Sequence, residues 1–320
     1  MMQLYKKRDF GSFISDTFSF FKQYGRNYFR NYMLLNGLLL ILMIVVIVFG
    51  FREFFGVLFG SNISGQSYYF EQYYQNNLAV FIVIGIFLLL LSTALMIINF
   101  LFPVFYMKRV SQGQEKIGTD DMMADFKANI KKVMILYAGL NFLVIPVALV
   151  IFMISYALIL IFVGLILLLF IVPTLVNVIN FLCYDYFNSD KGFFESLSYA
   201  VRSQFSYRNG REGSPYWKYW GATLIMAIIC QVVISIFTAI PMVIFFIKLT
   251  TTPSNAEFEQ DPAGSGLGIL FFVIYGISLL MSLLLMNMQY VNSGLMYYDS
   301  RTDLHQKTEL AEIETIGTHE

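Results

Sequence analysis

The side chains that could perform chemistry are few in this sequence and lie far apart. The only histidines, His305 and His319, are in the polar C-terminal segment without the spacing of a metal-binding set, so an incidental role is favoured over coordination. Ser293 and Cys183 have no nearby base in the sequence that would activate them as nucleophiles. Cys183 and Cys230 form no CxxC motif. We therefore expect no enzymatic activity, no metal ion and no cofactor.

A second group of polar residues consists of amides inside long apolar runs. They are Asn99, Asn141, Asn177, Asn180, Gln231, Asn287 and Asn292. Such amides commonly hydrogen-bond between membrane helices, at about 0.6 kcal/mol each. Asn177 and Asn180 are three residues apart and share a helical face, so the group could instead line a ligand cavity that opens to the cytoplasm. We expect interhelical packing and keep the cavity as the alternative.

The composition indicates that these residues are positioned by membrane helices. The chain of 320 residues is 58% hydrophobic and 13% charged, against about 25% charged in average soluble domains. Its net charge is zero and its Lys and Arg residues are dispersed, which gives no sign of a nucleic-acid partner. Apart from Lys218 at the start of the run at 217–246, the apolar runs contain no charged residue, which argues against a proton-driven pump.

Uncharged apolar runs predict an all-α fold with six crossings, because a spanning helix needs about 20 apolar residues. Val133–Tyr184 lacks charge over 52 positions and must form a hairpin, with its turn expected at Met153–Ala157. The predicted crossings are about residues 33–50, 78–107, 133–153, 157–184, 217–246 and 267–298. We expect one membrane domain over residues 1–298 and an acidic tail over residues 299–320.

The distribution of positive charge predicts the orientation. Lys and Arg number 19 in the terminal segments and in the loops on the same side as the termini, and 2 in the opposite loops. By the positive-inside rule, both termini should be cytoplasmic. The expected location is the bacterial cytoplasmic (inner) membrane, as a multi-pass protein.

Amphipathic segments precede the odd-numbered crossings and predict three helices at the cytoplasmic membrane surface. They cover about residues 9–30, 119–132 and 191–205. In the third, Leu197 and Val201 belong to an apolar face, and Glu195, Ser196 and Ser203 to a polar face. A catalytic helix is the other interpretation of this segment. The fold would then consist of three units, each an amphipathic helix followed by a helical hairpin.

Several stretches carry a resemblance to a known group. "NVINFLCYDYF" ends a crossing, "GFFESLSYAVRSQF" forms an amphipathic helix, and "SPYWKYWGATLI" begins the next crossing. In this pattern the chain resembles uncharacterised bacterial six-helix integral membrane proteins, related to the membrane domain fused to some glycerophosphodiester phosphodiesterases. The resemblance implies a fold and a location. No segment is long and polar enough to be a phosphodiesterase domain, so hydrolytic activity is not implied.

These features favour a non-enzymatic scaffold or accessory subunit of a membrane complex. The alternative is a protein that handles lipids or small molecules through the amide-lined cavity. Expected partners are membrane lipids and a membrane or cytoplasmic protein, bound through the tail, where Leu310, Ile313 and Ile316 recur at three-residue intervals. A frayed, solvated tail is the other interpretation.

Overall fold

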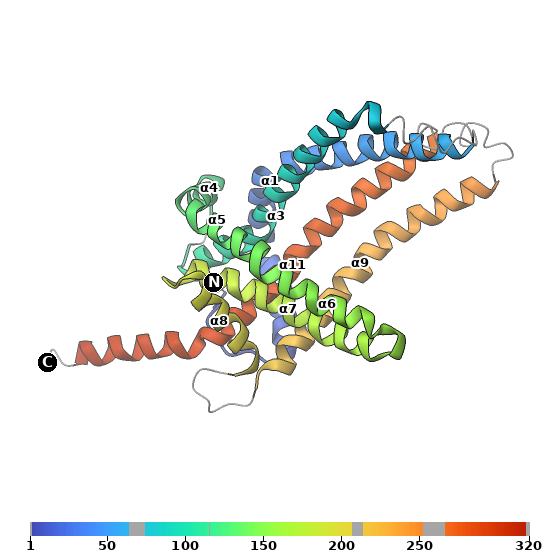
Figure 1. Cartoon of the computed structure of the whole chain (residues 1–320). Coiled ribbons are helices and arrows are strands. Elements are labelled where there is room, and N and C mark those ends of the chain that lie inside the picture. The colour runs from blue at the N-terminus through green and yellow to red at the C-terminus, as the bar shows by residue number, and fades with distance from the viewer. Residues whose placement is uncertain (1, 64–73, 115, 207–213, 252–265, 318–320) are drawn as a thin grey trace. The chain divides into compact units, whose positions relative to one another are not determined.

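The computed structural model describes residues 2–63, 74–114, 116–206, 214–251 and 266–317, and within these ranges the chain is helical without a strand (Figure 1). The first helices are α1 (Phe10–Ile63), α3 (Leu78–Ser111), α4 (Thr119–Ala128) and α5 (Ile130–Gly139). A π-helical turn (Leu140–Val144) leads into α6 (Ile145–Ala157), and a 3₁₀ turn (Ile159–Ile161) precedes α7 (Val163–Asn188). The last helices are α8 (Phe193–Phe205), α9 (Tyr216–Thr251) and α11 (Gly266–Gly317).

Within the described residues, six helical stretches are long and apolar enough to cross a membrane. They are Phe10–Val46, Leu78–Ser111, Ile130–Ala157, Val163–Asn188, Tyr216–Ala239 and Ile269–Thr302. The prediction of an all-helical chain with six such segments is therefore confirmed. Between the predicted crossings at 33–50 and 78–107, α1 continues to Ile63, so residues 51–63 are helical where a loop was expected. Residues 64–73 and 252–265 lie outside the described residues.

The chain divides into two compact units. Unit 1 comprises residues 1–35, 99–228 and 287–320, and unit 2 comprises residues 36–98 and 229–286. Helices α1, α3, α9 and α11 contribute to both units, whereas α4 to α8 belong to unit 1. In unit 2 the side chains of Leu40, Leu91 and Leu95 are buried, and the polar contacts described below, except that of Gln231, lie in unit 1.

The core of unit 1 is rich in aromatic rings from α1 and α3. On α1, buried side chains recur every three or four residues at Phe13, Thr17, Phe20, Tyr24, Tyr28 and Tyr32. The ring of Tyr28 lies 4.9 Å from those of Phe102 and Tyr106 in edge-on arrangements. The segment predicted as a separate surface helix at 9–30 is continuous with the first crossing, because this buried stripe runs without a break from Phe13 to Tyr32.

The turn of the hairpin lies later than predicted. Met153–Ala157 is helical, and the chain reverses at Leu158–Phe162, where Phe162 has a left-handed backbone with φ of 60°. Gly164 permits the reversal, because a Cβ atom there would collide with the backbone carbonyl of Ser155. The turn contains no polar turn residue that the sequence would reveal. Its position depends instead on Gly164, two residues beyond it.

Helix α8 divides its surface differently from the predicted pattern. Phe193 and Ala200 from the apolar side are buried together with Ser196 and Ser203 from the polar side. Phe194 is 72% exposed, and other apolar side chains such as Val201 are also exposed. The protein-facing side is therefore the one with small residues, which allow close packing.

Candidate functional site: a buried polar layer and an apolar groove

A fully buried carboxylate, Asp299 on α11, holds three elements of unit 1 together. Its Oδ1 accepts a 2.6 Å hydrogen bond from the backbone N–H of Arg8. Its Oδ2 accepts from the ammonium of Lys218 at 2.9 Å and from the hydroxyl of Tyr219 at 2.7 Å, both on α9. All three contacts come from donors, so both oxygens of the buried carboxylate are hydrogen-bonded, and the residue has a structural role.

Arg8 extends this network into the segment that precedes α1. Its guanidinium donates to Asp16 at 2.9 Å and to backbone carbonyls, including that of Leu4 at 2.7 Å. Burial lowers the pKa of Arg8, and the carboxylates of Asp16 and Asp299 oppose this shift. Since a guanidinium group ordinarily loses its proton only far above physiological pH, the side chain stays charged and its contacts persist across the physiological range.

A second buried carboxylate, Asp185, lies near the C-terminal end of α7. It pairs with Arg301 on α11 and with Lys191 at 3.5 Å, and the hydroxyl of Tyr297 donates to it at 3.4 Å. The guanidinium carbon of Arg301 lies 3.9 Å from the ring centre of Tyr199 on α8, a cation–π geometry. Asp185 thus joins α7, α8 and α11 in the way that Asp299 joins the N-terminal segment, α9 and α11.

Four of the seven predicted amides are buried and hydrogen-bonded to a different segment. The hydroxyl of Tyr28 donates to Asn287 at 2.7 Å, and that of Tyr32 donates to Asn99. The other two accept from hydroxyls as follows: Asn292 from Thr17 at 3.2 Å, and Asn177 from Thr223 at 2.7 Å and Ser293 at 3.4 Å. These bonds connect α1, α3, α7, α9 and α11.

The other three predicted amides make local contacts. Asn141 and Asn180 each donate to a carbonyl four residues earlier in their own helix, at 2.9 Å and 2.8 Å. Gln231 is exposed in unit 2 and donates to Ser235 at 3.4 Å. The structure thus places Asn177 and Asn292 next to hydroxyl groups of other segments, whereas Asn141 and Gln231 have only local contacts.

Two amides that are hydrogen-bonded to Thr223 each have one side-chain atom with no hydrogen-bond partner among the described residues. These atoms are Nδ2 of Asn177 and Oε1 of Gln289, and both atoms are buried. The Nε2 of Gln289 donates a long bond of 3.4 Å to the carbonyl of Thr223. A buried amide atom without a partner is costly in free energy, so these two atoms could form hydrogen bonds to an additional ligand.

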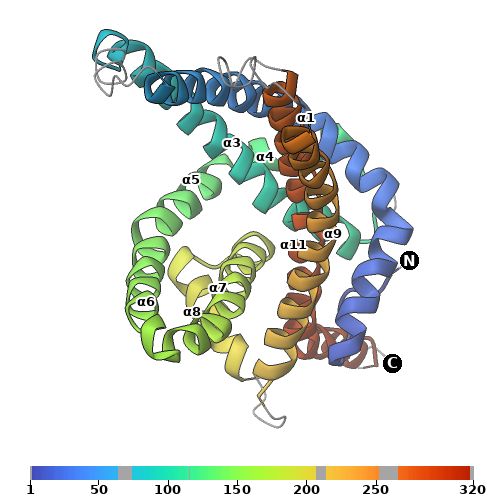
Figure 2. The ribbon, with the colours of Figure 1, turned by 90° about the vertical axis from the view of Figure 1, so that its right-hand side faces the viewer.

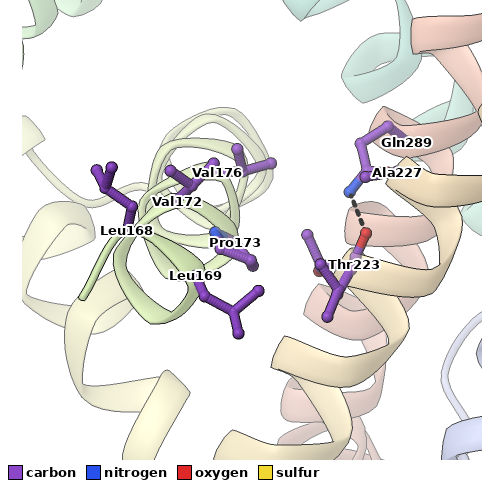
Figure 3. Close-up of a pocket in the computed structure, with 9 residues that line it drawn as sticks. Leu168, Leu169, Val172, Pro173, Val176, Thr223, Ala227 and Gln289 are labelled. Atoms are coloured by element: carbon purple, nitrogen blue, oxygen red, sulfur yellow. Dashed lines mark hydrogen bonds between the residues drawn. The ribbon is translucent and has the colours of Figure 1, made fainter. Parts of the chain in front are cut away.

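A groove of about 310 Å³ lies between α7 and α9 and is lined in part by Gln289 of α11 (Figure 3). We call it the α7–α9 groove. It is lined by Leu168, Leu169, Val172, Pro173, Val176, Thr223, Leu224, Ala227 and Gln289. The seven predicted amides are not among these lining residues, so the described groove is apolar, with one hydroxyl and one amide.

No family model, curated protein or solved structure matches this chain. In the described part of the chain, no group of three His, Cys, Asp or Glu side chains is placed to hold a metal ion.

Sequence reasoning missed the two buried carboxylates. Asp185 and Asp299 lie just beyond the predicted ends of even-numbered crossings, and Asp299 was assigned to the solvated tail. A signal existed in their surroundings, "CYDYF" and "YYDSR", where an acidic residue directly follows a tyrosine at the end of an apolar run. If such a carboxylate is buried, it must be paired or hydrogen-bonded.

Proposed function

We propose that this protein is a non-enzymatic scaffold or accessory subunit of the bacterial cytoplasmic membrane, with both termini in the cytoplasm. The observation that supports it best is the interhelical bonding of Asn99, Asn177, Asn287 and Asn292. Helices that must separate during transport would have to break these buried bonds. A framework that holds one arrangement would keep them. The resemblance to uncharacterised six-helix bacterial membrane proteins bears on the fold and the location only.

A disulfide lock tests the proposal. Thr17 and Asn292 are in direct contact on α1 and α11, so a Thr17→Cys/Asn292→Cys pair should fix the two helices to each other. Cross-linking and mass spectrometry in native membranes should find a protein partner at fixed stoichiometry. Oxidation of the two introduced cysteines to a disulfide should leave the complex with that partner intact. Loss of the complex on oxidation, or the presence of lipid alone in the native preparation, would argue against a scaffold. The reduced pair is the matched control.

A second candidate function is lipid handling, which is favoured by the α7–α9 groove. An apolar groove within membrane-spanning segments suits an acyl chain, and Thr223 and Gln289 offer polar contacts in its lining. Ala227→Trp should fill the groove and reduce the lipid that co-purifies, as measured by native mass spectrometry. Ala239→Trp places the same ring on another exposed alanine of α9 and should have no effect. Equal lipid content in both variants would remove the support for this function.

A further inference from the structure

The turn between α6 and α7 exposes only large apolar side chains. Leu160 is 91% exposed, Phe162 74% and Ile161 63%. Turns in water are normally built from Gly, Pro, Asn, Asp and Ser, because their side chains are solvated and their backbones adapt. Between Val133 and Tyr184 the chain contains no charged residue at all. The composition of this turn is that of a segment surrounded by hydrocarbon.

The backbone of the turn is also suited to hydrocarbon, where unpaired N–H groups are costly. The N–H of Leu158 donates to Ile154 at 3.2 Å, and that of Phe162 donates to Ile159 at 2.9 Å. Those of Ile161 and Gly164 both donate to the carbonyl of Leu158, at 3.3 Å and 3.0 Å. Four amides of the reversal are therefore paired with carbonyl groups of the hairpin itself.

The opposite end of the hairpin carries its charged contacts. Lys108 donates to the carbonyl of Phe187 at 2.7 Å, and the ammonium of Lys132 lies 5.5 Å from the ring centre of Tyr186. The buried Asp185 lies at the same end of α7. This end is therefore fixed where water and lipid headgroups are available.

α7 runs in a different direction from the adjoining parts of α9 and α11 in unit 1. Figure 2 views α7 nearly along its axis, whereas the adjoining parts of α9 and α11 run along the plane of the picture, and Figure 3 shows the same relation. Membrane helices that both span the bilayer usually cross at about 20° or 40°. From Val163 to Asp185, α7 is about 33 Å long along its axis. A strong tilt away from the membrane normal makes the depth to which α7 reaches into the bilayer smaller than the roughly 30 Å thickness of a hydrocarbon core.

We propose that α5, α6 and α7 form a membrane-embedded hairpin that starts at the cytoplasmic face, reverses within the hydrocarbon at Leu158–Phe162 and returns to the same face. Acyl chains cover the turn, because the exposed apolar surface continues from the turn along the lipid-compatible faces of α6 and α7. Although both arms are long and apolar enough to span, neither reaches the outer surface. Both termini remain on one side, and the inference rests on the proposed orientation but not on the scaffold role.

Single cysteines in vesicles of phosphatidylcholine and phosphatidylglycerol test this inference. Leu160→Cys and Tyr156→Cys replace exposed side chains, so both variants should fold. Neither should react with an impermeant maleimide from outside intact cells. A spin label at either position should collide readily with oxygen and poorly with a water-soluble nickel complex. Asn76→Cys and Gln114→Cys serve as the predicted outer and cytoplasmic references, and the native chain gives the background from Cys183 and Cys230, which are buried.

Two results would overturn the proposal. Labelling of Leu160→Cys from outside to the level of Asn76→Cys would show that the hairpin crosses completely. Protection of the spin label from both oxygen and nickel would show that protein covers the turn, either a second copy or another chain.

Discussion

The amide of Asn287 on α11 accepts a 2.7 Å hydrogen bond from the hydroxyl of Tyr28 on α1, across 259 residues of sequence. Both side chains are fully buried, and the ring of Tyr28 also packs edge-on against Phe102 and Tyr106 of α3. One tyrosine thus joins three helices through its ring and its hydroxyl. The contact explains why the polar atoms of this apolar chain are tolerated in its interior.

Tyr28→Phe should lower the free energy of unfolding by about 1 kcal/mol, because the amide of Asn287 loses its hydroxyl donor while the ring packing is preserved. Unfolding of the detergent-solubilised protein in increasing SDS measures the change. Asn141→Leu is the control and should change stability by less than about 0.5 kcal/mol, since Asn141 bonds only within its own helix. Equal effects of the two substitutions would contradict the interhelical role.

Asp299→Ala should destabilise the protein by about 3–5 kcal/mol, because it leaves Lys218 in a partly buried site without its carboxylate. The yield of folded protein, measured by size-exclusion chromatography, should fall sharply. Adding Lys218→Met to Asp299→Ala should recover part of the loss, since the uncompensated charge is removed. Asp9→Ala removes an exposed acid that accepts from the N–H of Ser12 at the start of α1, so it should cost little stability and lower the yield far less. A double variant as unstable as the sum of the singles would show that the pair is not coupled.

Gly294→Ala should be strongly destabilising, because a Cβ atom at this position would collide with the hydroxyl of Tyr184 and the sulfur of Met107. Gly85→Ala has open space around the new methyl group and should be neutral or slightly stabilising through helix propensity. The thermal midpoint of each purified variant tests the contrast. A tolerated Gly294→Ala would show that α7 and α11 do not pack this closely.

Ala200→Leu should lower stability by about 1–3 kcal/mol, since Ala200 is completely buried on the protein-facing side of α8. Val201→Leu, on the neighbouring residue, should have little effect because Val201 is 43% exposed. Thermal unfolding followed by tryptophan fluorescence measures both. A larger effect of Val201→Leu would place the packed face of α8 on its other side.

The sequence determined the features that depend on local composition. Long uncharged runs specify helices in a medium without water, because every backbone N–H must find a partner within its own segment. For this reason all six apolar helices and the seven amides within apolar runs could be identified without a structure. The same reasoning identified α8 from its helical spacing, with the bounds Phe193–Phe205 inside the predicted range 191–205.

Only the tertiary structure decided which polar groups meet. Tyr28 and Asn287, or Arg8 and Asp299, are brought together by packing between ends of the chain, and no local pattern specifies such pairs. The small residues Ser196 and Ala200 are buried because α8 approaches its neighbours closely, whereas hydrophobicity alone selects Phe194, which is exposed. In a membrane both surfaces of a helix can be apolar, so hydrophobicity does not distinguish the protein-facing side from the lipid-facing side. Shape complementarity and hydrogen bonding make that distinction, and both require the folded chain.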